Sequence, residues 1–136
     1  MTNIPDSLAN FDWVSARAKC TPFKIFEVLH SHVQQDIQKR NLLPAEIAAH
    51  KTFSFQSNGN WFAVVYGGNK GIKFVLTENG IKVEDIESRR ILHEGVLVMS
   101  DDGQCRLRAG SVEYDLWQFR KLALHDLFFV NQEIVP

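Results

Sequence analysis

The spacing of apolar residues changes twice along the chain, and the segment before the first change has the spacing of a helix. Thr21-Pro22 is typical of a helix start, because Thr can cap the first amide groups and Pro needs no amide partner there. Apolar residues then recur every three or four positions, at Phe26, Leu29, Val33 and Ile37. This spacing predicts a helix from Pro22 to about Asn41 that ends before Pro44. A short helix is also expected upstream, around residues 11–18.

From Thr52 onward, apolar residues alternate with polar ones and turn residues arrive at short intervals. This is the pattern of antiparallel strands joined by hairpins. Asn58-Gly59 and Asp102-Gly103 are turn dipeptides, because their backbones readily take the conformations that tight turns need. Six strands are predicted, over residues 53–56, 61–66, 72–77, 81–86, 91–99 and 104–109.

After Gly110 the apolar period lengthens again and predicts a C-terminal helix to about Phe129. Alternation over residues 112–116 leaves open a short strand before this helix. Because the strands are segregated from the helices, the expected fold is α+β. We predict an N-terminal helix, an antiparallel meander of about six curved strands and a C-terminal helix. A chain of 136 residues suits one core, so residues 1–136 are expected to form a single domain.

Two predicted strands are apolar on both faces, whereas a sheet with one solvated face would alternate cleanly. These are Trp61 to Tyr66 and Val96 to Met99. The second cover could be the sheet curling on itself, a second subunit or an apolar ligand. Leu127 to Val130 are unusually apolar for residues near a chain end. We therefore expect the C-terminal segment, through Pro136, to dock on its own sheet or on a second copy.

Charge and cysteine usage narrow the classes of function. The chain has 15 basic and 16 acidic residues, and this balance argues against a general nucleic-acid binder. No apolar run approaches the roughly 20 residues of a membrane-spanning helix, and the first 13 residues lack a signal-peptide pattern. Cys20 and Cys105 are isolated from each other, which favours two buried, reduced thiols. The expectation is a cytoplasmic protein with no membrane contact.

One electrostatic pattern leaves a nucleic-acid hypothesis open. Four cations occupy the polar phase of predicted strands and could share one sheet face: Lys73, Lys82, Arg106 and Arg108. Such a face could bind single-stranded RNA with an affinity that falls steeply with salt. A solvated face balanced by Glu84 and Glu87 is the interpretation that we favour.

Motifs for catalysis, a metal or a cofactor are missing from the sequence. His32 and Asp36 stand four apart on the predicted helix, so their side chains can meet, but no third metal ligand is evident. His93 and Glu94 are adjacent in a strand and should face opposite ways. The glycines of residues 67–71 match neither phosphate-binding order. We therefore expect no catalytic residues, no metal and no cofactor.

These observations favour a non-catalytic cytoplasmic binding or interaction module. It is expected to form a homodimer or bind a protein partner through an apolar sheet face and the C-terminal segment. Four residues are the candidate contacts: Trp61, Tyr66, Trp117 and Arg120. Aromatic and arginine side chains carry much of the binding energy in protein interfaces.

The alternative is a protein, or an enzyme, that binds a small apolar ligand. Its cavity would lie between the curved sheet and the first helix, and it would be lined by Phe26, Phe55, Phe62, Val64 and Met99. His32 or His93 would be its acid–base group, since imidazole titrates near neutral pH.

Overall fold

The computed structural model describes residues 10–44 and 51–129 of the chain. Within these ranges it confirms the predicted α+β class. The helices are α2 (Trp13–Lys19), α3 (Pro22–Asn41) and α5 (Leu116–Phe129). The strands are β1 (Ser54–Asn58), β2 (Trp61–Tyr66), β3 (Lys70–Leu76), β4 (Gly80–Asp85), β5 (Ile91–Met99), β6 (Cys105–Ala109) and β7 (Val112–Tyr114).

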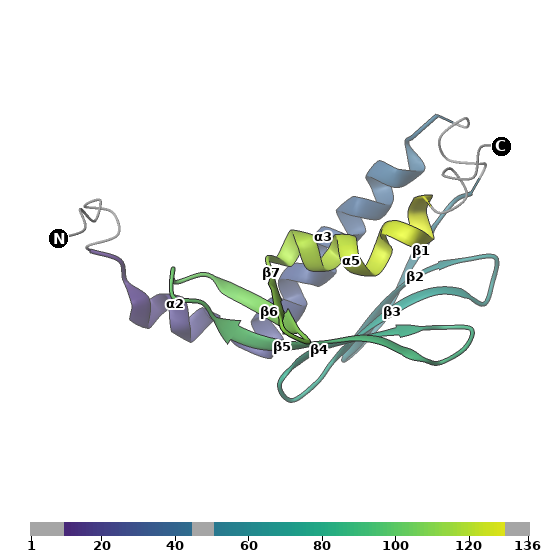
Figure 1. Ribbon diagram of the computed structural model, residues 1–136. Coiled ribbons are helices and arrows are strands. Elements are labelled where there is room, and N and C mark those ends of the chain that lie inside the picture. Colours follow the sequence, from purple (N-terminus) through teal and green to yellow (C-terminus); the bar gives the residue numbers. More distant parts are fainter. Residues whose placement is uncertain (1–9, 45–50, 130–136) are drawn as a thin grey trace.

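The seven strands form one antiparallel sheet in which the order along the chain is also the order in space. Figure 1 shows that α3 and α5 lie on the same face of this curved sheet, while α2 lies beside the far end of the β5–β6 hairpin. We call the face under α3 and α5 the helix face and the opposite one the outer face. Every connection in the sheet is a short hairpin, as the spacing of turn residues predicted.

Helix α3 has the bounds that its sequence predicts. The Thr21 hydroxyl accepts a hydrogen bond from the Lys24 amide (3.3 Å), and Pro22 occupies the first helical position. The apolar stripe is buried against the sheet, and Leu29 and Val33 are wholly inaccessible to solvent. Burial of such a stripe, at roughly 1.5–3 kcal/mol per large aliphatic side chain, holds the helix in place.

Stacked aromatic rings fill the space between α3 and the sheet. Phe62 on β2 stacks on Phe74 of β3, its cross-strand partner, with ring centroids 4.8 Å apart. Phe55 on β1 stacks on its other side at 5.7 Å, and Phe26 of α3 contacts the same ring at 5.2 Å. The region under α3 is therefore a packed core.

The sheet differs from the prediction in its number of strands, which is seven instead of six. The added strand is β7, the short strand that the alternation before the C-terminal helix left open. At the other edge β1 begins at Ser54, one residue later than predicted. The backbone of Phe53 is paired instead with the Asn41 side chain, which accepts from its amide (2.9 Å) and donates to its carbonyl (2.8 Å).

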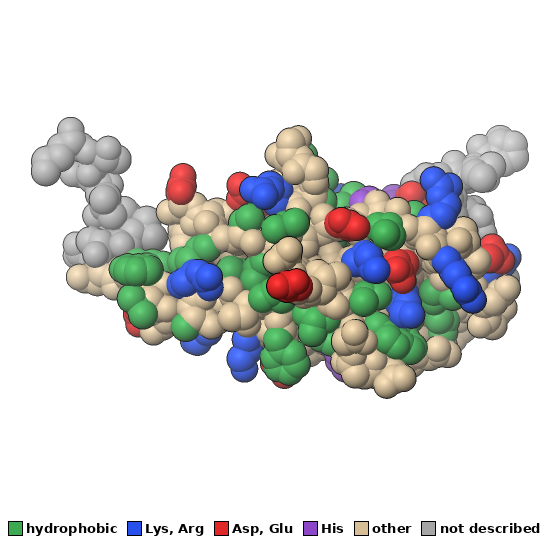
Figure 2. Space-filling view, turned by 90° about the horizontal axis from the view of Figure 1, so that it is seen from below, with side chains coloured by type: hydrophobic (Ala, Val, Ile, Leu, Met, Phe, Trp, Pro, Cys, Tyr) green, Lys and Arg blue, Asp and Glu red, His purple; other side chains and the backbone are tan. Residues whose placement is uncertain are grey.

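The sequence predicts that two strands are buried on both faces, and the structure shows this for β2 only. On β2 the outer-face residues Ala63 and Val65 are buried as well as the helix-face residues. On β5 the outer-face residue Val96 is 39% exposed. The outer face as a whole mixes apolar, basic and acidic side chains, as Figure 2 shows.

Cys20 and Cys105 are joined in a disulfide, which corrects the expectation of two free thiols. Cys20 ends α2 and Cys105 begins β6, and their Cα atoms lie 5.5 Å apart. The pairing depends on the tertiary structure, because 85 residues separate the two positions. The bond therefore connects the start of α3 to the half of the sheet most distant from β1.

Reduction of this disulfide should lower the free energy of unfolding by about 4 kcal/mol, because the bond closes an 85-residue loop in the unfolded chain. Urea denaturation with and without reductant measures the difference. The Cys20→Ser/Cys105→Ser variant is the control, and its stability should not respond to reductant. Free thiols titrated in the unfolded protein without reductant would show that the bond does not form.

Gly95 lets α5 approach the backbone of β5. A Cβ atom at this position would lie 2.9 Å from the Phe119 ring and 3.2 Å from the Leu107 Cβ, and both side chains are wholly buried. Contacts this short force buried neighbours to move. Glycine at position 95 thus sets the distance between α5 and the sheet.

Gly95→Ala should therefore destabilise the fold by about 1–3 kcal/mol, the cost of overpacking a core. Without the clash, alanine in a strand would stabilise by about 0.5–1 kcal/mol relative to glycine, so the sign of the change is diagnostic. Thermal and urea denaturation measure it, and adding Phe119→Leu should recover part of the loss. A more stable Gly95→Ala protein would contradict the close approach.

Candidate functional site

A surface groove of about 400 Å³ runs between α3 and α5. The α3 wall consists of Asp36, Lys39 and Arg40, continued by Leu43 just after the helix. The α5 wall consists of Trp117, Arg120, Lys121, Leu124, His125, Phe128 and Phe129. Leu124 and Phe128 are buried, whereas Trp117 on the rim is 54% exposed. Apolar side chains of α5 thus lie opposite charged side chains of α3.

An arginine closes the groove near the start of α5. Arg120 Nε donates to Asp36 Oδ2 of α3 at 2.7 Å. A second guanidinium nitrogen lies 3.3 Å from His32 Nδ1, and because arginine only donates, this His32 nitrogen is the acceptor. His32 and Asp36, which are neighbours on α3, thus both contact Arg120. Their role is to join two helices.

A second arginine joins the same helices near the end of α5. Arg40 is only 2% exposed, and its Nε donates to the Phe128 carbonyl at 2.9 Å. Its guanidinium lies 5.0 Å from the Phe53 ring centroid and 5.8 Å from that of Phe129. Burial lowers the pKa of Arg40, because loss of water disfavours the charged form. Sequence reasoning missed this residue, although it continues the three- and four-residue spacing of the buried α3 stripe.

A second hollow of about 500 Å³ lies across the exposed face of α5 from the groove. Trp117, Lys121 and His125 line both hollows, and we call these three residues the α5 ridge. The second hollow also contains Val112 of β7, which is 49% exposed, and Leu122. Two acidic residues, Glu113 and Asp126, complete it.

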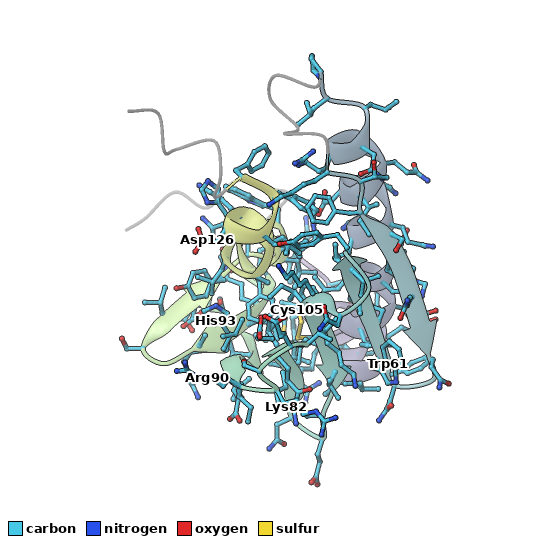
Figure 3. The ribbon with its side chains drawn as sticks, turned by 90° about the vertical axis from the view of Figure 1, so that its right-hand side faces the viewer. Trp61, Lys82, Arg90, His93, Cys105 and Asp126 are labelled. Atoms are coloured by element: carbon cyan, nitrogen blue, oxygen red, sulfur yellow. A yellow bond between two sulfur atoms is a disulfide. The ribbon has the colours of Figure 1, made fainter. Side chains whose placement is uncertain are left out.

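The structure brings together two of the four predicted contact residues. Trp117 and Arg120 line the same groove. Trp61 lies on the outer face under Lys73, whose ammonium is 4.6 Å from a ring centroid. Tyr66 packs edge-on against Phe53 at 5.2 Å, at the end of β2. Figure 3 shows Trp61 at the side of the sheet away from Asp126 of α5.

The residues of the alternative cavity do not surround one space. Phe26, Phe62 and Val64 are buried in the core, where the rings are in contact. Met99 instead lines hollows between α2 and the end of β5. The structure supplies no observation that favours the small apolar ligand.

Histidine and glutamate at positions 93 and 94 face opposite sides of the sheet, as predicted. His93 is paired with Val83 on the helix face and Glu94 with Lys82 on the outer face. A register shift lies beside His93, between Val83 and Glu84 of the neighbouring strand. Burial lowers the pKa of His93, so the folded protein favours the neutral imidazole.

The four cations of the predicted basic face do share the outer face, as the strand register shows. Acidic neighbours compensate two of them. Lys82 pairs with Glu84 at 3.1 Å, and Arg106 contacts both Asp102 and Asp115 at 2.7 Å. Arg106 holds the pKa of Asp102 at about 2. This arrangement favours the solvated, balanced face.

Neither a metal centre nor a membrane-spanning helix is found within the described residues. Ranges 10–44 and 51–129 contain no cluster of three or more His, Cys, Asp or Glu side chains that could hold a metal ion. Over the same ranges, no helix is long and apolar enough to cross a membrane. The groove and the second hollow beside α5 form the candidate functional site.

Comparison with known proteins identifies no relative: no protein-family model, curated protein or solved structure matches the sequence or the fold.

The lowered pKa of His93 predicts a pH effect on stability. The unfolded chain, with a histidine pKa near 6.5, binds this proton more readily than the folded one. The free energy of unfolding should therefore be highest above pH 6.5 and should fall as the pH drops towards the lower folded-state pKa. His93→Gln should lose less stability than the wild type between about pH 7.5 and about pH 5. Urea denaturation at both pH values tests this, and equal losses would rule out the effect.

Proposed function

We propose that this protein is a non-catalytic binding module that forms a homodimer through the α5 ridge and the second hollow. The observation that carries the proposal is the exposure of two large apolar side chains, Trp117 and Val112, around one hollow. A tryptophan beside a concave apolar surface is typical of the centre of a protein interface. The C-terminal segment, as far as it is described, contributes through α5.

The charges of this surface are suited to a second copy of the same chain. In a twofold dimer the same patch lies on both sides, so residue i of one copy contacts residue j of the other and the reverse. Lys121 and the acidic pair Glu113 and Asp126 line the same hollow. Opposite charges on one patch allow Lys121 of each copy to pair with a carboxylate of the other.

The disulfide bears on where the module works. The expected cytoplasmic location depended on reduced cysteines, and the Cys20–Cys105 bond removes that support. Disulfides persist mainly in oxidising compartments. We therefore propose that the protein works in such a compartment.

Trp117→Ala should weaken the homodimer by about 2 kcal/mol or more, as truncation of a central interface anchor does. Sedimentation equilibrium over a dilution series measures the dissociation constant. Trp13→Ala is the matched control, because Trp13 is also exposed (64%) but lies on α2, away from α5. A monomeric wild type, or a dimer dissociated by Trp13→Ala but not by Trp117→Ala, would refute this interface.

Charge reversal gives an independent test of the pairing. Lys121→Glu and Asp126→Lys should each weaken the dimer about tenfold, because each places like charges together. The double variant should recover most of the affinity in the same sedimentation experiment, since it restores opposite charges. Additive losses in the double variant would show that the two residues do not face each other across the interface.

A further inference from the structure

We infer that the groove between α3 and α5 binds an acidic amphipathic helix of another protein. This inference does not depend on the homodimer, because it uses the α3 wall and the buried floor between the helices. The two surfaces share the α5 ridge, so the experiment below separates them by means of residues that belong to one surface only.

The shape of the groove fits a helix. Its α5 wall extends from Trp117 through Leu124 to Phe128, positions seven and four residues apart on one side of a 14-residue helix. The opposite wall is formed by the end of α3, at Asp36, Lys39 and Arg40, and by Leu43 just beyond the helix. A third helix lying between two helices buries residues spaced i, i+3 or i+4, and i+7.

The walls of the groove are joined before any partner arrives. Arg120 connects to Asp36 on α3, and Arg40 connects to the Phe128 carbonyl on α5. Arg120, Asp36 and Arg40 are largely shielded from solvent. Their contacts therefore fix the distance between the two helices. A preorganised surface loses less conformational entropy on binding.

Charge indicates which kind of helix fits. Lys39 on the α3 wall and Lys121 on the α5 wall form no ion pair within the described residues. Arg120 is matched by Asp36. With Arg40 left aside, three cations and one carboxylate line the groove. A helix with carboxylates on both sides of its apolar stripe would complement both rims.

The described helices of a second copy do not fit this requirement. Helix α2 contains no acidic residue, and α5 contains only Asp126. The apolar stripe of α3 is buried in its own core. Because no described helix of a second copy meets this requirement, the inferred occupant of the groove is a helix of a different protein.

Two labelled synthetic helical peptides with the same apolar residues, one flanked by Glu and one by Lys, test the inference. Fluorescence anisotropy with the full chain should show about tenfold tighter binding of the Glu peptide, with an affinity that falls as salt rises. Lys39→Glu should weaken the Glu peptide about tenfold. Lys24→Glu, the same charge change at an exposed position near the other end of α3, should leave it unchanged. Circular dichroism confirms that both variants fold.

Equal binding of the two peptides, or equal effects of Lys39→Glu and Lys24→Glu, would overturn the inference. Binding that requires deletion of residues 130–136 would also overturn it, because the occupant would then be this chain's own C-terminal segment. Asp126→Lys changes the homodimer surface and does not line the groove. Because the two surfaces share the α5 ridge, a dimer would compete with the peptide, so peptide affinity that is unchanged or higher in Asp126→Lys supports the groove. A monomeric wild type that binds the Glu peptide, or a dimer that does not bind it, would show which of the two proposals fails.

Discussion

Packing of the α3 stripe against the Phe62 cluster is the interaction on which the rest of the molecule depends. Phe62 and Phe74 are cross-strand partners and Phe55 stacks on Phe62 from the diagonal position on β1, so the three rings present one continuous apolar surface to which α3 can bind. Helix α5 then occupies the remaining part of the same face, where Gly95 allows Phe119 to reach the backbone of β5. Both helices are held on one face, and a groove between them is the consequence.

Polar contacts determine how wide that groove is. Apolar packing alone is non-directional and would allow α5 to move towards α3. Arg120 and Arg40 each join the two helices with directional hydrogen bonds, so the helices are held at a fixed separation with the groove between them. Neither Lys39 nor Lys121, on the two rims, forms an ion pair within the part of the chain described. The groove is positive because Asp36, the one carboxylate among the described residues that line it, is already paired with Arg120.

The disulfide adds a constraint of a different kind. Helix α2 has no buried residue, so packing contributes little to its position. The Cys20–Cys105 bond instead connects the end of α2 to β6, on the half of the sheet most distant from β1. An oxidising environment would therefore favour the arrangement in which α2 lies beside the β5–β6 hairpin.

The sequence by itself determined the local elements. Helix bounds at Pro22 and Asn41, the hairpins and the α+β class follow from periodicity and turn chemistry, which act over a few residues. Only the tertiary structure decided that Cys20 meets Cys105, that Arg120 contacts His32 and Asp36, and that Trp117 and Arg120 share a groove while Trp61 does not. The disulfide and the contacts of Arg120 join residues more than 80 positions apart, and Trp61 lies on another face of the fold from α5. Such contacts depend on the placement of whole elements, which short-range patterns do not contain.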